Sequence, residues 1–336
     1  MFVKPFEVPK HILQAEALDT RTPVDHIQKE TINKKARNLR TGYNGEKSME
    51  FFLSFLPEDE FIIFHYLRIP DKQGHFQIDI LLLSLKFFLI VEVKNIYDNM
   101  HFDGMGQAYR NNNDEIEVFT NPVDQVNLQH RRFLDYLRKY DLPPIPIEKI
   151  VVYSRDDTFL KNITNNKTIN EIVMHKEKVL PRIEEFSEMY QTPSFSEDQL
   201  IEITFKLLEE HEPEEYNGMK KFDVTPKDFV KGVFCPKCGA VPMLWRGGKW
   251  RCTDCGCTSR NAHRSVLADF ALLVGDYINN RQAREFLQVG SEYSVKRILQ
   301  QEHFDQIGEK SGRKYRLDAE KLLNPEVHKK SAEVHN

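Results

Sequence analysis

All five cysteines of this chain lie between positions 235 and 257, and four of them form two CxxC pairs, Cys235 with Cys238 and Cys252 with Cys255. A tetrahedral zinc ion takes four soft ligands, and each CxxC turn delivers two thiolates to one side of the ion. An odd and tightly clustered set of cysteines argues against a disulfide framework. The spacing therefore predicts that these four thiolates hold one structural Zn²⁺.

The residues around the two pairs predict a zinc ribbon over residues 232–260, with Gly247-Gly248 as a hairpin turn between two short strands. Two other ligands are conceivable. Cys257 could replace Cys255, although the CxxC spacing favours Cys255. His263 could also bind the ion, although such a histidine is more often a surface residue.

The hairpin of the expected ribbon carries aromatic and basic side chains. Trp245 and Trp250 suit stacking on nucleic-acid bases, and the alternative is that they cover a small core. Residues 227–336 hold 19 Lys and Arg against 13 Asp and Glu, a net of +6, whereas residues 1–226 hold 28 against 38, a net of −10. A basic C-terminal part suggests contact with a polyanion. The candidate phosphate contacts on the hairpin are Arg246, Lys249 and Arg251.

With 40% apolar and 29% charged residues, the composition is that of a soluble globular protein, and 336 residues allow two or three folded units. The N-terminal segment lacks the basic-then-apolar order of a secretion signal. The longest apolar run, residues 80–93, is too short for a membrane span, which takes roughly 20 residues. We therefore expect a cytoplasmic protein without a membrane partner.

The hydrophobic pattern of the first half of the chain predicts an α/β unit around a mixed sheet. Pro122 opens one of its helices, which extends to about Tyr140, because proline fits the first helical turn. Another helix is expected over residues 42–55. Strands are expected over residues 61–67, 76–83, 87–93, 116–120, 147–153 and 171–174. Residues 182–215 are acidic and helical in pattern.

Polar residues interrupt two of the expected strands. Side chains of a strand alternate between its faces, so Gln77 and Asp79 are expected on one face, with Ile78 and Ile80 on the other. By the same rule Glu92 and Lys94 share a face. If the two strands pair as a hairpin, Asp79, Glu92 and Lys94 gather at one place, where the two carboxylates suit Mg²⁺ and Glu46 could complete the metal shell. The alternative is an ion pair without chemistry.

The chain contains, in this order, Gly45-Glu46, Gln77-Ile78-Asp79, Val91-Glu92-Val93-Lys94-Asn95, and Asn121-Pro122 with Gln125. Over roughly residues 38–155 these motifs resemble the nuclease-related domain NERD, a family similar to the PD-(D/E)XK endonucleases. The resemblance implies a restriction-endonuclease-like α/β core with a mixed sheet. It also implies Mg²⁺ or Mn²⁺ bound by Asp79, Glu92 and the Val93 carbonyl. The implied catalytic set is Glu46, Asp79, Glu92, Lys94 and Gln125.

Beyond the ribbon, helical patterns over residues 264–274, 280–287 and 294–299, with Gly290 in the turn between the last two, resemble a winged helix-turn-helix. Residues 306–317 fit its hairpin wing. In that family the second helix of the pair enters the DNA major groove. The alternative is a helical hairpin that binds a protein. The DNA-contact candidates are Ser291, Ser294, Lys296 and Arg297 on the helix and Arg313, Lys314 and Arg316 on the wing.

These patterns divide the chain into six expected segments: 1–37 a polar helical extension, 38–190 the nuclease-like domain, 191–231 an acidic segment and linker, 232–260 the ribbon, 261–320 the winged helix, and 321–336 a tail. We expect a Mg²⁺-dependent nuclease whose C-terminal part binds DNA. A second hypothesis is a non-catalytic DNA-binding regulator that uses the nuclease-like fold as a scaffold. RNA as the partner stays open. Nucleases of this superfamily often cut both strands as dimers, which makes a homodimer one conceivable assembly.

Overall fold

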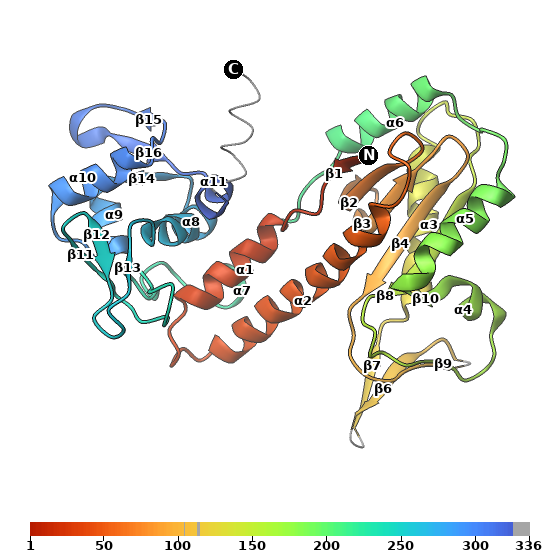
Figure 1. Cartoon of the computed structure of the whole chain (residues 1–336), viewed down its shortest axis with the longest axis horizontal. Coiled ribbons are helices and arrows are strands. Elements are labelled where there is room, and N and C mark those ends of the chain that lie inside the picture. The colour runs from red at the N-terminus through yellow and green to blue at the C-terminus, as the bar shows by residue number, and fades with distance from the viewer. Residues whose placement is uncertain (104, 113–114, 325–336) are drawn as a thin grey trace. The chain divides into compact units, whose positions relative to one another are not determined.

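The computed structural model describes residues 1–103, 105–112 and 115–324 (Figure 1). The chain divides into two compact units. The first contains Met1–Pro9 and Asn38–Glu214, and the second contains Lys10–Arg37 and the residues from Glu215 onward. Residues 1–37, treated as one segment in the sequence analysis, are thus shared between the units. Among the described residues no helix is long and apolar enough to cross a membrane.

A six-stranded mixed sheet forms the centre of the first unit, in the order β1-β2-β3-β4-β8-β10. The three long strands β2, β3 and β4 are joined as antiparallel neighbours. Strands β8 and β10 continue the sheet in parallel to β4, and β1 runs parallel to β2 at the other edge. The strand bounds are β1 Phe2–Lys4, β2 Ile62–Asp71, β3 Gly74–Leu83, β4 Phe88–Lys94, β8 Ile147–Tyr153 and β10 Val173–His175.

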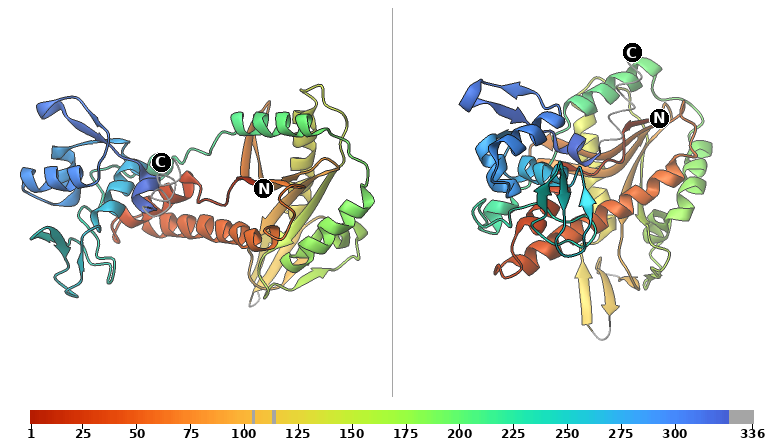
Figure 2. Two further views of the ribbon diagram at one scale, coloured as in Figure 1. Left: turned by 45° about the horizontal axis from the view of Figure 1, so that its top comes forward. Right: turned by 60° about the vertical axis from the view of Figure 1, so that its left-hand side comes forward.

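Helices cover both faces of this sheet (Figure 2). Alternate residues of β4 show the two faces, since Phe88 and Ile90 belong to one buried cluster while Leu89 and Val91 belong to another. The first cluster includes residues of α3 (Pro122–Leu137) and α6 (Glu197–Glu209), and the second includes residues of α2 (Lys29–Leu53) and α5 (Val179–Met189). Burial on both faces explains why β4 reads as a nearly continuous apolar run.

A second, four-stranded sheet in the order β7-β6-β5-β9 adjoins the main sheet, and its β6–β7 hairpin projects from the unit (Figure 1). Met100, Phe102 and Ala108 of this sheet pack into the same core as α3. The bounds are β5 Met100–Phe102, β6 Ala108–Asn112, β7 Glu115–Phe119, β9 Leu160–Asn162, with α4 (Lys167–Ile172) and the short 3₁₀ helix Lys176–Lys178 completing the unit.

Three expected boundaries were wrong. The strand expected over residues 61–67 continues to Asp71 as β2. The helix expected to begin at Gly42 begins at Lys29, because Ile32 and Ala36, four residues apart, give its polar first half a buried stripe. The strand expected over residues 171–174 is reduced to β10, since Asn166 caps a helix whose backbone continues to Ile172.

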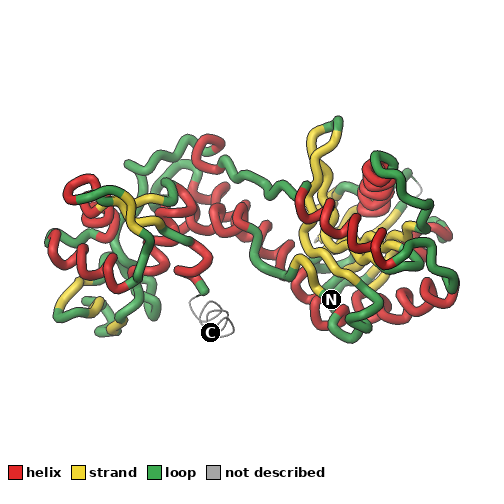
Figure 3. The backbone as a smooth tube through the Cα atoms, turned by 90° about the horizontal axis from the view of Figure 1, so that it is seen from above, coloured by secondary structure: helices red, strands yellow, loops and turns green. Residues whose placement is uncertain are grey.

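The second unit contains more helix than strand (Figure 3). Its helices are α1 (Lys10–Arg21), the first residues of α2, α7 (Gly218–Lys221), α8 (His263–Leu273), α9 (Asn280–Leu287), α10 (Glu292–Gln301) and α11 (Ala319–Leu323). One three-stranded sheet contains β11 (Leu244–Arg246), β12 (Lys249–Arg251) and β13 (Thr258–Ser259). The other has the order β14-β16-β15, with bounds Tyr277–Asn279, Lys314–Arg316 and Gln306–Ile307, and the 3₁₀ helix Lys310–Gly312 precedes β16.

One buried cluster joins all parts of the second unit. It contains Cys252 and Trp250 of the cysteine-rich segment, Val266 of α8, and Leu18 of α1. A buried ion pair adds to this core, since the Arg21 guanidinium donates to Asp269 of α8 at 2.7 Å and to the carbonyls of Val230 and Gly232. The cysteine-rich segment is therefore part of a larger core.

Candidate functional site

The first candidate site lies where strands β3 and β4 separate. Their ladder ends at the pair Ile80–Val91, and beyond it the Asp79 carboxylate accepts a hydrogen bond from the backbone N–H of Val93 at 2.9 Å. The carboxylate thus replaces the backbone acceptor that a further ladder pair would supply. This bond holds Asp79, which is only 7% exposed, against the end of β4.

The expectation that Ile78 and Ile80 share one face of β3 was wrong, whereas Gln77 and Asp79 do meet, with Gln77 Nε2 3.5 Å from Asp79 Oδ1. Ile78 packs with the core around α3, whereas Ile80 packs with the core around α2 and α5, so the two do not share a face. In the neighbouring strand, Tyr66 lies between the partners of these isoleucines and has a left-handed backbone with φ 52°. This irregularity interrupts the alternation of both strands beside Asp79.

Glu92 and Lys94 face helix α3. The Lys94 ammonium donates to Glu92 Oε1 at 2.6 Å and to Gln125 Oε1 at 2.9 Å, while Gln129 Nε2 donates to Glu92 Oε2 at 2.6 Å. Gln125 and Gln129 are four residues apart and therefore lie on one face of the helix. Sequence reasoning missed Gln129, although its spacing from Gln125 was a usable signal. Glu92 is 1% exposed, so these donors offset the cost of burying its charge.

Helix α2 brings Glu46 to the same region. A Cβ on Gly45 would lie 2.6 Å from Cβ of Asn95, so only glycine allows the helix this close to the end of β4. The next residue, Glu46, contacts Nε2 of His65 through Oε2 at 2.6 Å. Burial lowers the pKa of His65 to about 3, so the ring is neutral, and its Nε2–H donates to Glu46 when that carboxyl is ionised. Sequence reasoning missed His65. The available signal was the presence of one histidine within the otherwise largely apolar strand β2.

The carboxylates share one electrostatic environment. Burial raises the pKa of Glu46 to about 7, and the negative charge of Glu92 adds to the effect. Burial also raises the pKa of Asp79 well above its usual value, with the charges of Glu92 and Glu46 as further causes. The Lys94 ammonium opposes both shifts. The three carboxyls and the Lys94 ammonium thus form one coupled group of charges.

The raised pKa of Glu46 gives the metal-free first unit a stabilising contribution that is lost as the pH rises from about 4.5 to about 7, because over this window the folded state keeps a proton on Glu46 that the unfolded state has released. The lowered pKa of His65 acts in the opposite direction between about pH 3 and 6.5, so the Glu46 contribution is read from the difference between the wild type and a Glu46 variant. The expected fall from Glu46 is on the order of 3 kcal/mol. Calorimetric unfolding of the wild type and of Glu46→Gln in EDTA between pH 5 and 7.5 measures it as the difference between the two profiles.

Glu46→Gln should remove much of this pH dependence, while Glu50→Gln, one turn further along the same helix, should keep it. Mg²⁺ should also reduce the fall, since a bound cation favours the ionised carboxylates. Parallel pH profiles for the wild type and Glu46→Gln would contradict the assignment of the raised pKa to Glu46.

The second candidate site is the cysteine cluster. The Sγ atoms of Cys235, Cys238, Cys252 and Cys255 all lie within 4.8 Å of one another, with Cys235–Cys255 and Cys238–Cys252 separations of 3.6 Å. A tetrahedral ion with Zn–S bonds of about 2.3 Å separates its sulfurs by about 3.8 Å, so the four thiols fit zinc. Over the ranges that the structure describes, no other group of three or more histidine, cysteine or acidic residues meets this spacing.

The backbone conformation around the two cysteine pairs favours metal binding. A glycine with positive φ follows each pair, Gly239 at 75° and Gly256 at 69°, which lets the chain turn back after the second cysteine. Backbone N–H groups, that of Cys238 first, lower the pKa of the Cys235 thiol to about 6. Cys255 rather than Cys257 completes the group, in agreement with the CxxC spacing. The four cysteines can therefore hold a metal ion such as zinc.

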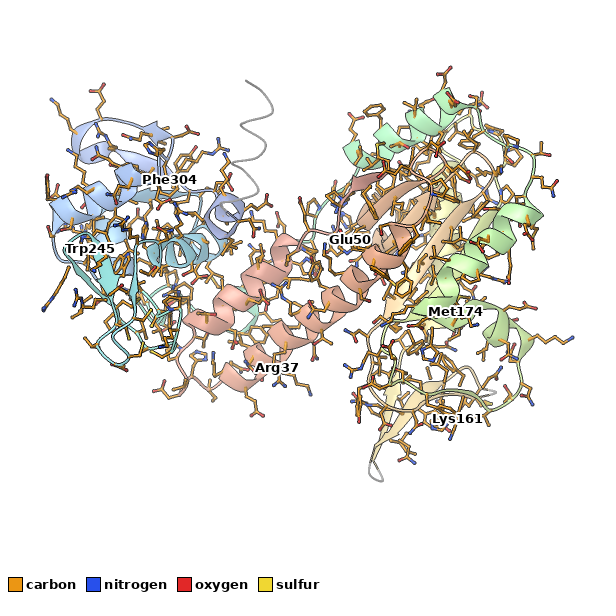
Figure 4. The ribbon with its side chains drawn as sticks, in the orientation of Figure 1. Arg37, Glu50, Lys161, Met174, Trp245 and Phe304 are labelled. Carbon is orange, nitrogen blue, oxygen red and sulfur yellow. The ribbon has the colours of Figure 1, made fainter. Side chains whose placement is uncertain are left out.

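The expectation of a surface position for His263 was wrong. The ring is 2% exposed, its Nδ1 accepts from the indole N–H of Trp250 at 3.0 Å, and its Nε2 lies 2.8 Å from Glu302. An indole N–H can only donate, so Nδ1 must accept and Nε2 carries the proton toward Glu302. Trp250 is fully buried and belongs to the core, whereas Trp245 is partly exposed beside it, with ring centroids 5.1 Å apart (Figure 4).

The candidate nucleic-acid contacts all belong to the second unit but come from three elements. On the β11–β12 hairpin Arg246 pairs with Lys249, and Arg246 and Arg251 are exposed. On α10 the Ser291 hydroxyl caps the helix by accepting from the Ser294 N–H. The remaining candidates are Lys296, Arg297, Lys314 and Arg316, which are exposed, and Ser294 and Arg313, which are half-buried.

The fold and the first site together define a mixed α/β domain with acidic side chains, a lysine and two glutamines gathered at the separation of two strands. Residues 41–154 match the family model NERD, the nuclease-related domain. A search of the curated proteins found no match, and a search of the solved structures found none either.

Proposed function

We propose that this protein is a Mg²⁺-dependent nuclease that cleaves phosphodiester bonds of DNA. The observation that carries the proposal is the convergence of Asp79, Glu92 and Lys94 at the separation of β3 and β4, inside the nuclease-related domain. The mixed sheet between two helical layers supports a restriction-endonuclease-like core. Asp79, Glu92 and the Val93 carbonyl would hold the cation, which supplies electrophilic stabilisation of the phosphate and a more acidic bound water.

The side chains around the cation would orient the attacking water, accept its proton and hold the carboxylates in place. Lys94 is fixed by Glu92 and Gln125, and the third N–H of its ammonium can donate to the attacking water or to a phosphate oxygen. Glu46, with a pKa of about 7, can accept a proton from that water near neutral pH. Gln129 keeps Glu92 in place, and His65 does the same for Glu46.

The second unit would bind the nucleic acid. The order α8, β14, α9, α10 and the β15–β16 hairpin supports a winged helix-turn-helix, with α10 as the helix that enters the major groove. The net charge of +6 over residues 227–336 favours contact with phosphates. A zinc ion held by four cysteines has no open position for water, so its role is structural.

A second candidate function is a non-catalytic DNA-binding regulator. One observation favours it: both oxygens of Glu92 already accept hydrogen bonds, and Asp79 accepts one from Val93. The cluster is thus stable as an ion pair without a cation. Under this hypothesis Mg²⁺ and Mn²⁺ would show no Asp79-dependent binding in calorimetric titrations.

The test of the nuclease is incubation of the purified protein with end-labelled single- and double-stranded DNA and RNA, in Mg²⁺, Mn²⁺ or EDTA. We expect cleavage of DNA with either metal and none in EDTA. Glu92→Ala should lose the activity, while Glu60→Ala, at an exposed position of the same unit, should keep it. Cleavage that persists in EDTA or in Glu92→Ala would overturn the proposal.

A further inference from the structure

A pocket of about 240 Å³ lies next to Lys94, at the point where β4, β8 and the start of α3 meet. It is below the volume of typical drug-sized pockets, roughly 300–1,000 Å³. Its walls combine apolar and polar side chains. The lining residues are Lys94, Ile96, Phe119, Thr120, Pro122, Gln125 and Tyr153.

One polar group of this pocket has no partner in the fold. Tyr153 is fully buried, and its hydroxyl forms no hydrogen bond with the residues that the structure describes. A buried hydroxyl without a partner is costly, so native structures normally satisfy such groups. Tyr153 pairs with Lys94 across β8 and β4 and is one of the residues that line the pocket.

A second polar wall is also open to a ligand. The Gln125 carbonyl oxygen accepts from Lys94, which leaves the two N–H groups of the same carboxamide as donors. The apolar part of the pocket wall is formed by Phe119, Ile96 and Pro122. The Phe119 ring carries the Arg110 guanidinium 5.6 Å from its centroid, and Arg110 is itself held by Glu117.

We infer that this pocket binds one unstacked nucleobase of a single-stranded nucleic acid, next to the phosphodiester at Lys94. A base has apolar faces that suit the aromatic and aliphatic walls, and edge acceptors that suit the Tyr153 hydroxyl and the Gln125 amide. A base inside a duplex must first be unstacked and unpaired, which costs a few kcal/mol, so an already unpaired base enters such a pocket more readily. The inference rests on the proposed nuclease function and names its substrate as an unpaired strand.

The Tyr153→Phe variant separates this role from a structural one. Because the hydroxyl has no partner in the fold, its removal should leave the melting temperature unchanged or raise it. The same variant should weaken binding of single-stranded DNA about five- to tenfold, the size of one lost hydrogen bond. A lower melting temperature would show that the hydroxyl stabilises the fold, and the inference would then be wrong.

The binding experiment uses a single-stranded oligonucleotide with 2-aminopurine, a base whose fluorescence increases when it leaves the stack. With Ca²⁺ in place of Mg²⁺, titration of the wild type should raise the fluorescence, and Tyr153→Phe and Phe119→Ala should shift the titration to higher concentration. Phe159→Ala removes an aromatic ring that is 59% exposed and does not line the pocket, and it should bind like the wild type. Equal titrations for all four proteins would overturn the inference.

A cleavage experiment in Mg²⁺ distinguishes this inference from the proposed function. Single-stranded DNA should be cut faster than the matching duplex, and an abasic nucleotide beside the cleaved bond should slow the reaction. Cleavage of strand and duplex at equal rates, with no effect of the abasic nucleotide, would retain the nuclease and reject the base pocket. Absence of cleavage from every substrate would reject the nuclease, and the fluorescence titration would still decide the pocket.

Discussion

Lys94→Ala should lower the rate of DNA cleavage at least a hundredfold, while the DNA binding that we propose for the second unit remains close to that of the wild type. Lys94 is the cation that contacts Glu92 directly, and the loss of one preorganised donor at a reacting centre costs about 10²–10³ in rate. Single-turnover cleavage measures the rate, and fluorescence anisotropy with labelled DNA in Ca²⁺ measures binding.

Loss of the ammonium also leaves Glu92 buried with Gln129 as its remaining hydrogen-bond donor. Removing one partner of a buried ion pair costs about 3–5 kcal/mol, so a melting curve must show that the variant is folded at the assay temperature. Lys161→Ala, on β9 of the same unit, is the matched control and should cleave normally. A folded Lys94→Ala protein that cleaves at the wild-type rate would contradict the assigned role.

Loss of the metal from the cysteine cluster should unfold the second unit. Binding of structural zinc contributes about 10–16 kcal/mol in zinc-finger peptides, and here Cys235 and Cys252 belong to the core shared with α8 and α1. Cys252→Ser, or treatment with a strong chelator, should therefore remove the cooperative transition of this unit. Both tryptophans of the chain, Trp245 and Trp250, belong to it, so tryptophan fluorescence reports its unfolding selectively.

The chain supplies its own control for this experiment. Cys257 lies two residues beyond Cys255 but outside the four-cysteine group, so Cys257→Ser should keep one zinc per chain and the wild-type melting curve. Atomic absorption measures the metal content. Zinc retained by Cys255→Ser and lost by Cys257→Ser would mean that Cys257 is the fourth ligand.

Local patterns in the sequence predicted the elements that carry the first site. Strand β8 has the bounds expected, and β3 and β4 pair as the expected hairpin. Helix α3 begins at Pro122 as expected, because the proline and the Asn121 cap are signals contained in a few adjacent residues.

What the sequence did not reveal depends on contacts between distant residues. Strict alternation in β3 fails beside Asp79, where Tyr66 of another strand has a left-handed backbone. Gln129 and His65 join the site only because α3 and β2 lie next to Glu92 and Glu46. Local sequence patterns also do not predict that β8 pairs in parallel with β4, since β5, β6, β7 and α3 lie between these two strands in the chain.

The division of the chain into interleaved units has a consequence for synthesis on the ribosome. Leu18 of α1 and Ile32 of α2 are made early, but their apolar partners, such as Phe222, Val266 and Leu299, emerge much later. The first unit can complete its sheet before these partners exist, while the apolar stripe of α1 stays exposed. A nascent chain released before residue 222 should therefore be prone to aggregation and a client of chaperones, even though the segment that matches the nuclease-related domain is complete.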